Sequence, residues 1–218
     1  MRLTASQGLL ASAGADIDME SSLSREFFLR PTTAVARDLL GVWLWRRLDD
    51  GSLLHGPIVE CEAYTEDDPA CHAFRGRTRR CEVMFGPAGH AYVYFIYGMY
   101  NCLNVVTEPD GTPGAVLIRA VAAENTDGPG KLCREWAIDR SYNGSDLLIP
   151  GSDLWLGEGV RLPDELVEIT PRIGISVAVD RPWRFAVKDH PSVSGPRVVK
   201  PGKAGRRRRK SDDKEKRR

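Results

Sequence analysis

The chain has 218 residues, of which 42% are hydrophobic, and it carries 31 Lys and Arg residues against 30 Asp and Glu. This length and apolar content suffice for one domain with a full hydrophobic core. No apolar run approaches the roughly 20 residues of a membrane-spanning helix, and the N-terminus lacks the pattern of a signal peptide. We therefore expect a protein that stays inside the cell and makes no membrane contact.

The five cysteines are odd in number, and none forms a CxxC pair or stands at zinc-ligand spacing from a histidine. We expect neither disulfides nor structural zinc. The Gly-Lys pair at 130–131 lacks the other residues of a phosphate-binding loop, and the sequence contains no GxSxG, HExxH or GxGxxG motif. Nucleophilic triads, metal-dependent hydrolysis and dinucleotide chemistry therefore have no support in the sequence.

The two ends differ in composition from the middle of the chain. Residues 1–22 are rich in Ala, Ser and Gly and predict a flexible N-terminal segment. Residues 201–218 hold ten Lys or Arg against three acids, a net charge of +7, whereas the first 200 residues carry 21 basic and 27 acidic side chains. We predict that 201–218 is a disordered basic tail, either merely solvated or an arm with non-specific affinity for polyanions. The folded domain is expected at 23–200.

The first predicted elements are a helix and a strand pair. The segment 31–41, PTTAVARDLLG, predicts a helix of about three turns that Thr32 or Thr33 caps and Gly41 follows. Residues 42–48 and 56–64 then predict two paired strands around the turn DDGS.

Later elements follow in the same way. Residues 90–122 predict a three-stranded meander broken at Gly98 and at EPDGTPG. Residues 130–138 predict a helix, and 171–176 and 184–187 predict late strands. Strands clustered in the middle, with few helices, are typical of an α+β fold.

The strand at 58–64, IVECEAY, carries an unusual polar face. The period of two in a strand places Glu60, Glu62 and Tyr64 together, while the intervening residues form an apolar face. An apolar face can pack on the core and leave the polar face for chemistry.

Tyrosines are concentrated at 92, 94, 97 and 100. Because every buried tyrosine hydroxyl needs a hydrogen-bond partner, such a cluster favours a stacking surface over simple packing. Tyr92 and Tyr94 share one strand face, whereas Tyr97 lies next to Gly98, where the chain can turn. We predict that Tyr97 projects outward from a hairpin tip.

From about residue 24 to 195 the chain resembles the alkyladenine (3-methyladenine) DNA glycosylases. The matching segments, in order, are FFLRPTTAVARDLLG, IVECEAY, HAFRGRT, MFGPAGHAYVYFIYGMYNCLNVV, AVLIRA, GPGKLC and PRIGI. The resemblance implies a single α+β domain built on a curved antiparallel β-sheet with flanking helices. It also implies excision of alkylated and deaminated purines from double-stranded DNA without metal or cofactor. We expect a monomer that works where the DNA is.

The resemblance assigns the chemistry and the base pocket position by position. Glu62 would activate the attacking water, and Arg119 would help to hold that water. Tyr64 and Tyr94 would sandwich the flipped base, with His72 at its edge. An ionised carboxylate suits this reaction, because loss of a purine builds positive charge on the sugar.

Further residues would contact the DNA. Tyr97 would be the wedge that fills the vacated place in the duplex, and Asn104 would be the filter that collides with the amine of normal guanine. Lys131, Arg75 and Arg77 are candidates for phosphate contacts. The chain departs from the family at Arg79, where proline is expected, and in the loop at 65–71.

Each residue also has a structural alternative that the sequence leaves open. His72 fits a loop histidine with satisfied nitrogens, Arg119 fits a partner of a buried acid, and Asn104 fits a turn or strand end. The sequence also allows Glu62 to be a surface acid on a half-exposed strand, and we favour a supporting role for Glu60. The three basic residues fit a solvated surface nearly as well.

Two other functions compete with the glycosylase. A sugar O-glycosidase would use Glu60 and Glu62 as its carboxylate pair, although a separation of about 6.6 Å along a strand suits neither usual geometry well. A nucleic-acid binding module without catalysis would use the tyrosines to stack bases and the tail to hold phosphates. Base release from a damaged duplex separates the enzyme from both.

Overall fold

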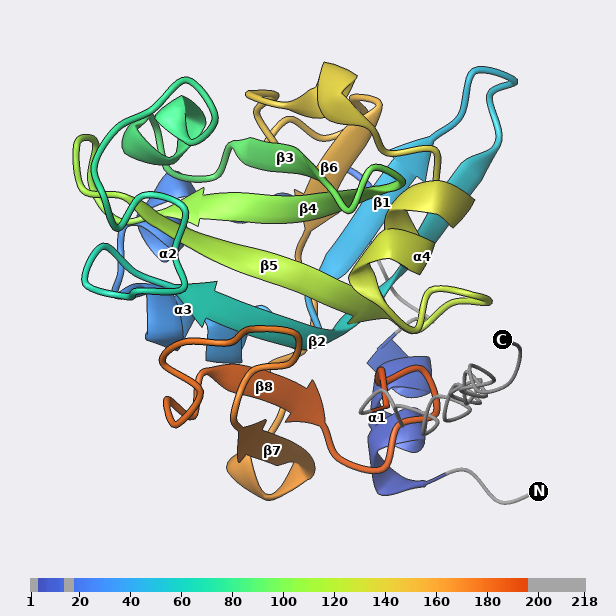
Figure 1. The fold of residues 1–218 in the computed structure, drawn as a ribbon. Coiled ribbons are helices and arrows are strands. Elements are labelled where there is room, and N and C mark those ends of the chain that lie inside the picture. Colours follow the sequence, from blue (N-terminus) through green and yellow to red (C-terminus); the bar gives the residue numbers. More distant parts are fainter. Residues whose placement is uncertain (1–3, 14–17, 196–218) are drawn as a thin grey trace, which may run out of the picture.

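The computed structural model describes residues 4–13 and 18–195, and the predicted basic tail at 201–218 lies outside them. Within the described residues, eight strands form one antiparallel sheet that curls strongly, with few helices around it (Figure 1). This architecture confirms the predicted α+β fold on a curved antiparallel sheet.

Strand β2 (Leu53–Tyr64) is the spine of the sheet. Its first half pairs with β1 (Trp43–Arg47), which in turn pairs with β6 (Leu154–Gly157). The pairing register of the second half shifts on both sides of Glu60. Such irregularities bend a strand and increase its twist, so the strand changes partners near the residue that starts the polar face.

The second half of β2 lies between two groups of strands. On one side are β5 (Gly114–Val121), β4 (Tyr100–Thr107) and β3 (Ala91–Ile96), which form the predicted meander. On the other side are β8 (Arg184–Val187) and β7 (Val167–Thr170). The strand pair around DDGS, the meander and the strand at 184–187 are thus confirmed.

The predicted strand at 171–176 is wrong. The strand that pairs with β8 is β7, and the following residues form a loop. Pro171 has no N–H to donate to a strand neighbour, and Gly174 adopts a φ of 83° that strands do not use. This loop instead turns toward the polar face of β2.

Helix α3 (Thr32–Asp38) is shorter than the predicted three turns, and neither threonine caps it. Pro31 occupies the N-cap position, while the Thr32 hydroxyl contacts Thr107 Oγ1 at 2.9 Å and donates to Glu108 Oε1 at 2.8 Å. The Thr32 hydroxyl therefore bonds to long-range partners, one on β4 and one just after it, and does not cap its own helix. Gly41 follows the helix with a φ of 91°, as expected.

The other helices are short. They are α2 (Arg25–Phe28), α4 (Pro129–Glu135) and the 3₁₀ helices Glu82–Phe85, Arg140–Tyr142 and Asp164–Leu166. Helix α4 confirms the helix predicted at 130–138, although it ends earlier. It packs on β4 and β5. None of the helices in the described ranges is long and apolar enough to cross a membrane.

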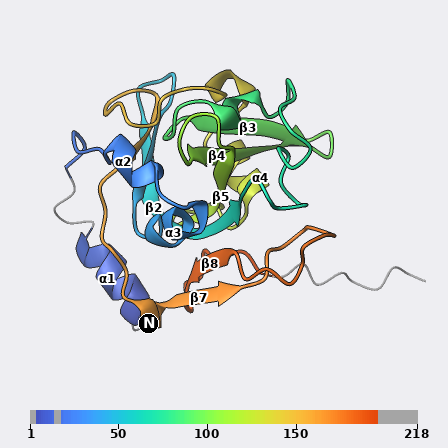
Figure 2. The same ribbon diagram turned by 90° about the vertical axis from the view of Figure 1, so that its left-hand side faces the viewer.

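Part of the segment 1–22, for which the sequence predicts flexibility, forms α1 (Ala5–Ala13), a helix at the edge of the molecule near β7 (Figure 2). Leu10 is buried and belongs to the main hydrophobic core. The Ser6 hydroxyl donates to the Lys188 carbonyl at 3.1 Å. The apolar Leu9–Leu10 pair gives this Ala- and Ser-rich stretch enough surface to bury against the domain.

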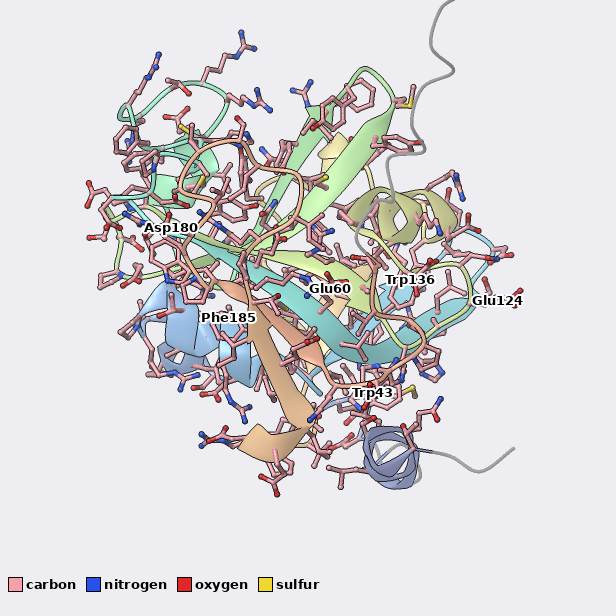
Figure 3. The ribbon with its side chains drawn as sticks, turned by 60° about the horizontal axis from the view of Figure 1, so that its bottom comes forward. Trp43, Glu60, Glu124, Trp136, Asp180 and Phe185 are labelled. Carbon is pink, nitrogen blue, oxygen red and sulfur yellow. The ribbon has the colours of Figure 1, made fainter. Side chains whose placement is uncertain are left out.

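The main core lies on the apolar face of β2, beneath α3. Val59, Cys61 and Ala63 are fully buried there, as the alternation of the strand predicts. The five cysteines are free thiols, and all are buried. Figure 3 places Glu60 near the middle of the molecule, with Phe185 of β8 to one side. The polar face of β2 is therefore also deep inside the protein.

Candidate active site

A cavity of about 590 Å³ opens on the polar side of the sheet, between β2, the β3–β4 hairpin, the start of α4 and the loop at 173–175. This volume is typical of pockets for small ligands. The cavity brings together eight of the residues predicted from the sequence: Glu62, Tyr64, His72, Tyr94, Tyr97, Asn104, Arg119 and Lys131.

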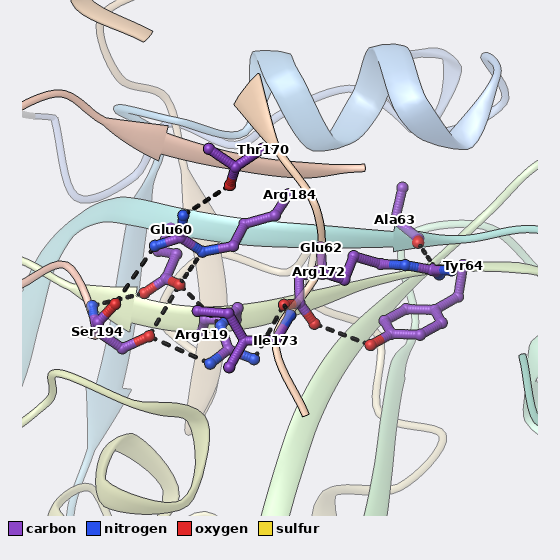
Figure 4. Close-up of polar contacts among 10 residues, drawn as sticks. All are labelled: Glu60, Glu62, Ala63, Tyr64, Arg119, Thr170, Arg172, Ile173, Arg184 and Ser194. Carbon is purple, nitrogen blue, oxygen red and sulfur yellow. Dashed lines mark hydrogen bonds and ion pairs between the residues drawn. The ribbon is translucent and has the colours of Figure 1, made fainter. Parts of the chain in front are cut away.

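Glu62 is fully buried, and its carboxylate is held by three neighbours (Figure 4). Oε1 accepts a hydrogen bond from the Ile173 N–H at 2.7 Å and forms an ion pair with Arg119 Nη1 at 3.1 Å. Oε2 accepts a hydrogen bond from the Tyr64 hydroxyl at 2.8 Å. A buried carboxylate stays charged only with such donors and a cation beside it.

Arg119 is itself anchored from behind by Glu60. Arg119 Nε donates to Glu60 Oε1 at 2.8 Å, and Arg184 Nε donates to the same oxygen at 2.7 Å. Ser194 adds its N–H to Glu60 Oε2 at 2.7 Å and its hydroxyl to Oε1 at 2.8 Å. Glu60 does not line the cavity, so its place behind Arg119 matches a supporting role.

The charges of this cluster stabilise one another. Burial alone would raise the pKa of Glu60, but the charges of Arg119 and Arg184 outweigh it and lower that pKa below its ordinary value. Burial opposes the charged guanidinium of Arg119, yet the nearby Glu62 and Glu60 raise the pKa of Arg119. The site thus keeps a fixed cation beside the Glu62 carboxylate.

Aromatic side chains form the walls of the cavity. Tyr64 rises from β2 and Tyr94 from β3, and the His72 ring meets Tyr94 edge-on at 4.6 Å between centroids. Burial and the charge of Arg80 lower the pKa of His72 to about 4, so the ring is neutral at pH 7. Burial and the Glu62 charge raise the pKa of Tyr64 well above its usual range, which keeps its hydroxyl a donor.

Two polar contacts hold the side chains at the cavity wall in place. The His72 Nδ1 atom lies 2.8 Å from the Tyr92 hydroxyl. The Asn104 amide donates to the Tyr92 carbonyl at 3.0 Å, and only 3% of Asn104 is exposed. Asn104 therefore presents a buried polar group from within β4 and is neither a turn residue nor a strand end.

Tyr97 stands at the tip of the β3–β4 hairpin, as the sequence predicts. Tyr97 and Gly98 have φ values of 55° and 69°, and the Met99 N–H donates to the Ile96 carbonyl at 3.3 Å. Positive φ at both central residues matches the type I′ turn of tight hairpins. Tyr97 is 69% exposed, the highest value among the large apolar and aromatic residues of the described chain.

The three basic residues that the sequence suggests as phosphate contacts lie in different places. Lys131 lies on the cavity rim, where its Nζ pairs with Asp127 at 2.8 Å. Arg77 stacks on the Phe85 ring at 4.9 Å, and both Arg75 and Arg77 are exposed residues outside the cavity lining. The structure therefore brings Lys131 to the site and places the two arginines on a neighbouring loop.

The comparisons with known proteins agree with this geometry. The profile of the methylpurine-DNA glycosylase (MPG) family matches residues 26–191. The chain belongs to the methylpurine-DNA glycosylase family. This confirms the resemblance drawn from the sequence, and it makes the protein a DNA glycosylase, a hydrolase that acts on DNA.

Several curated relatives share the name "Putative 3-methyladenine DNA glycosylase". One from Herpetosiphon aurantiacus is 44% identical over 208 residues, which cover 85% of this chain and 94% of the relative. One from Carboxydothermus hydrogenoformans is 46% identical and covers 79% and 98%. One from Methanocella arvoryzae is 47% identical and covers 79% and 95%. The similarity therefore spans nearly the full length of these relatives.

Some residues around the site of this glycosylase escaped the sequence analysis. Arg172 and Asp68 form a completely buried ion pair, and Arg184 and Ser194 hold Glu60. The available signal was weak: Arg172 stands between Pro171 and Ile173 with Glu168 four residues before it, yet its partner is the distant Asp68. A buried arginine requires a partner. Sequence alone does not say which acid that partner is.

Proposed function

We propose that this methylpurine-DNA glycosylase flips alkylated or deaminated purines out of duplex DNA and hydrolyses their N-glycosidic bond with a water activated by Glu62. The product is an abasic site, and the enzyme works inside the cell, with the DNA. The observation that carries the proposal is the buried Glu62 carboxylate, paired with Arg119 in a cavity walled by Tyr64 and Tyr94.

Base flipping explains the division of the tyrosines. An enzyme that acts on the glycosidic bond cannot reach it inside a stacked duplex, so extrusion costs a few kcal/mol. Stacking on aromatic side chains returns about 1 to 3 kcal/mol per base. Tyr64 and Tyr94 inside the cavity supply such faces, while the exposed Tyr97 at its mouth can fill the gap left in the duplex.

Glu62 suits the role of general base. An ionised carboxylate offers about four acceptor positions, and the Ile173 N–H, Arg119 and Tyr64 take three of them. One position on Oε2 is left for a water. The carboxylate charge also stabilises the oxocarbenium-like sugar as the purine leaves, and Arg119 lies 3.1 Å from it as the counter-charge.

The neighbouring acid disfavours the O-glycosidase alternative. A sugar hydrolase would need Glu60 at the substrate, yet both Glu60 oxygens accept hydrogen bonds from Arg119, Arg184 and Ser194 behind the cavity wall. A binding module without catalysis would need no buried carboxylate and arginine at the base of its pocket. Both the arrangement and the family favour the enzyme.

Release of free base from synthetic duplexes tests the proposal. One duplex carries hypoxanthine, a second carries an alkylated adenine and a third is undamaged. We expect free base and alkali-labile abasic sites from the first two only. Lys131 is the one lysine among the described residues that line the cavity, and its amine is bound by Asp127. Strand-nicking glycosylases react through a free amine, so we also expect no covalent adduct on borohydride treatment. Absence of base release from both damaged duplexes would refute the proposal.

A further inference from the structure

Arg172 is a buried arginine that does not line the cavity, although its neighbours do. Its side chain is 0% exposed and forms an ion pair with Asp68, in which Nη2 donates to Oδ1 at 2.9 Å. Arg172 Nη1 also donates to the carbonyl of Ala63 on β2 at 2.9 Å. These partners lie on separate segments, so Arg172 joins the loop at 171–175 to β2 and to the loop that follows it.

The guanidinium also stacks on aromatic rings. Its Cζ atom lies 4.6 Å from the centroid of the Tyr64 ring and 5.2 Å from that of Trp183. Because Tyr64 lines the cavity and Arg172 does not, the guanidinium meets Tyr64 from behind the cavity wall. A planar cation between two rings holds both at defined positions, which the tetrahedral ammonium of lysine does not do.

Two of the three groups on Glu62 are adjacent to this residue. Tyr64, whose hydroxyl donates to Oε2, rests on the Arg172 guanidinium. Ile173, whose N–H donates to Oε1, is the next residue in the chain. The third group, Arg119, is held independently by Glu60 on the other side of the carboxylate (Figure 4).

We propose that Arg172 is a positioning residue for base excision, which places the Tyr64 hydroxyl and the Ile173 N–H on the catalytic carboxylate. Tyr64 then has two tasks: its ring stacks on the base, and its hydroxyl orients Glu62. The inference rests on the proposed function, since it requires Glu62 to act as the general base.

Asp68 extends the same support to the base pocket. It accepts a hydrogen bond from the Ala70 N–H at 3.1 Å, and its own carbonyl accepts from the Cys71 N–H at 2.8 Å. Both donors lie in the segment that carries His72 to the cavity wall. The Arg172–Asp68 pair thus ties together the two loops that flank Tyr64.

The variants Arg172→Lys and Tyr64→Phe test the proposal in the full-length enzyme. Lysine keeps the charge but loses the flat face, and phenylalanine keeps the ring but loses the hydroxyl. A hydrogen bond to a charged group is worth about tenfold to a hundredfold in an equilibrium. We expect each variant to slow single-turnover excision at saturating enzyme by about that factor.

The pH profile distinguishes positioning from general loss of stability. The charged and ionisable groups near Glu62 are Glu60, Cys61, Tyr64, Tyr94, Cys102, Arg119 and Arg172. Arg172→Lys changes the charge of none of them. The Tyr64 hydroxyl donates to the Glu62 carboxylate, and loss of a donor disfavours the charged form, so the acidic limb of the excision rate should move upward in Tyr64→Phe. The same upward shift is expected in Arg172→Lys.

A double-mutant cycle decides whether Arg172 acts through Tyr64. We expect the double variant to be about as slow as the slower single variant. The proposal would be overturned if the rate losses of the two single variants multiply in the double variant, or if the acidic limb does not move in Arg172→Lys. If Arg172→Lys does not fold, Asp68→Asn takes its place in the cycle, with a smaller loss and the same non-additivity expected.

Arg181→Lys is the matched control, because Arg181 lies in the same connection between β7 and β8 and also stacks on Trp183, at 4.4 Å, but its ion pair is with Asp67 and its ring contact is not with Tyr64. We expect unchanged excision in this variant, and a loss equal to that of Arg172→Lys would count against the proposal. Failure of the wild-type enzyme to release base would instead refute the proposed function. Base release by the wild type with wild-type rates in Arg172→Lys would refute only the role of Arg172.

Discussion

The floor and the mouth of the cavity are built in opposite ways. At the floor and directly behind it, Glu62 and Glu60 are completely buried, and their oxygens are bound by fixed donors. At the mouth, Phe95, Tyr97 and Met99 on the β3–β4 hairpin are 47%, 69% and 64% exposed. One region buries charge, and the other exposes apolar groups.

Both arrangements are unfavourable for a protein considered alone. Buried charges cost desolvation free energy, which close pairing must offset, and Tyr97 adopts a left-handed φ that a side chain disfavours. The comparison teaches where each half of the proposed function resides. Bond cleavage needs groups that cannot move, whereas insertion into DNA needs a side chain that has no partner within the protein.

The strongest test of the floor is Glu62→Gln. The amide keeps the size and can still accept from the Ile173 N–H, but it cannot take a proton from water. General-base catalysis contributes typically about 10² to 10⁴ in rate. We expect base release to fall by that factor while binding to a damaged duplex, measured by fluorescence anisotropy, stays nearly unchanged. Substantial turnover by the variant would remove Glu62 from this role.

Glu60→Gln should affect stability more than chemistry. Removal of one partner from a buried ion pair costs about 3 to 5 kcal/mol, and this change weakens the hold on Arg119 and Arg184 together. Because Arg119 keeps its contact with Glu62, we expect a milder loss of excision than in Glu62→Gln. Denaturant unfolding and single-turnover rates measure the two effects. A larger loss of excision in Glu60→Gln than in Glu62→Gln would assign the general-base role to Glu60.

The same variant tests the pH dependence of folding. The pKa of Glu60 is lowered in the folded protein, so the unfolded chain binds this proton more readily. The stability from this group is fully present above its unfolded pKa of about 4.3 and is lost as the pH falls through the lower folded value. We expect the free energy of unfolding of the wild type to decline below about pH 4.5 and that of Glu60→Gln to decline less steeply.

Tyr97→Ser tests the mouth. Without the ring, the vacated place in the duplex is not filled, and we expect about a tenfold to hundredfold weaker binding of damaged duplex. A single strand has less stacking to replace and should be affected less. Tyr97→Phe keeps the ring and serves as the control. Equal losses on single and double strands would exclude the wedge role.

The smallest effect is expected from deletion of residues 201–218. This change removes a net charge of +7, so binding to damaged and undamaged DNA should weaken alike and depend less on salt. Excision at saturating enzyme should be unchanged. A slower saturated rate would show that the basic tail is part of the catalytic structure.

Local patterns were sufficient to predict one side of the site. The alternation of IVECEAY places Glu62 and Tyr64 on one face of β2, and the Tyr97–Gly98 pair indicates the hairpin tip. These signals are contained in a few consecutive residues. The strand pattern predicts the α+β fold, and the expected residue roles rest on the family resemblance.

The supporting contacts were not predictable in this way. Arg172 reaches Asp68 across 104 residues, and Ser194 reaches Glu60 across 134. No periodicity connects such partners, because the curl of the sheet alone brings them together. The prediction that a threonine caps α3 was wrong for the same reason, because the Thr32 hydroxyl bonds to Thr107 and Glu108 and not to its own helix.

The buried thiols have a consequence for survival of the enzyme under chemical attack. Alkylating agents react with thiolates, and burial raises the pKa of Cys71 to about 11 and raises the pKa values of Cys61, Cys102 and Cys133 as well. At neutral pH, about one Cys71 side chain in ten thousand is then a thiolate. An enzyme that removes alkylated bases must work while the reagents that made them are still present. Burial thus keeps the thiols of Cys61, Cys71, Cys102 and Cys133 protonated, which slows their reaction with those reagents even where Cys71 and Cys102 line the cavity.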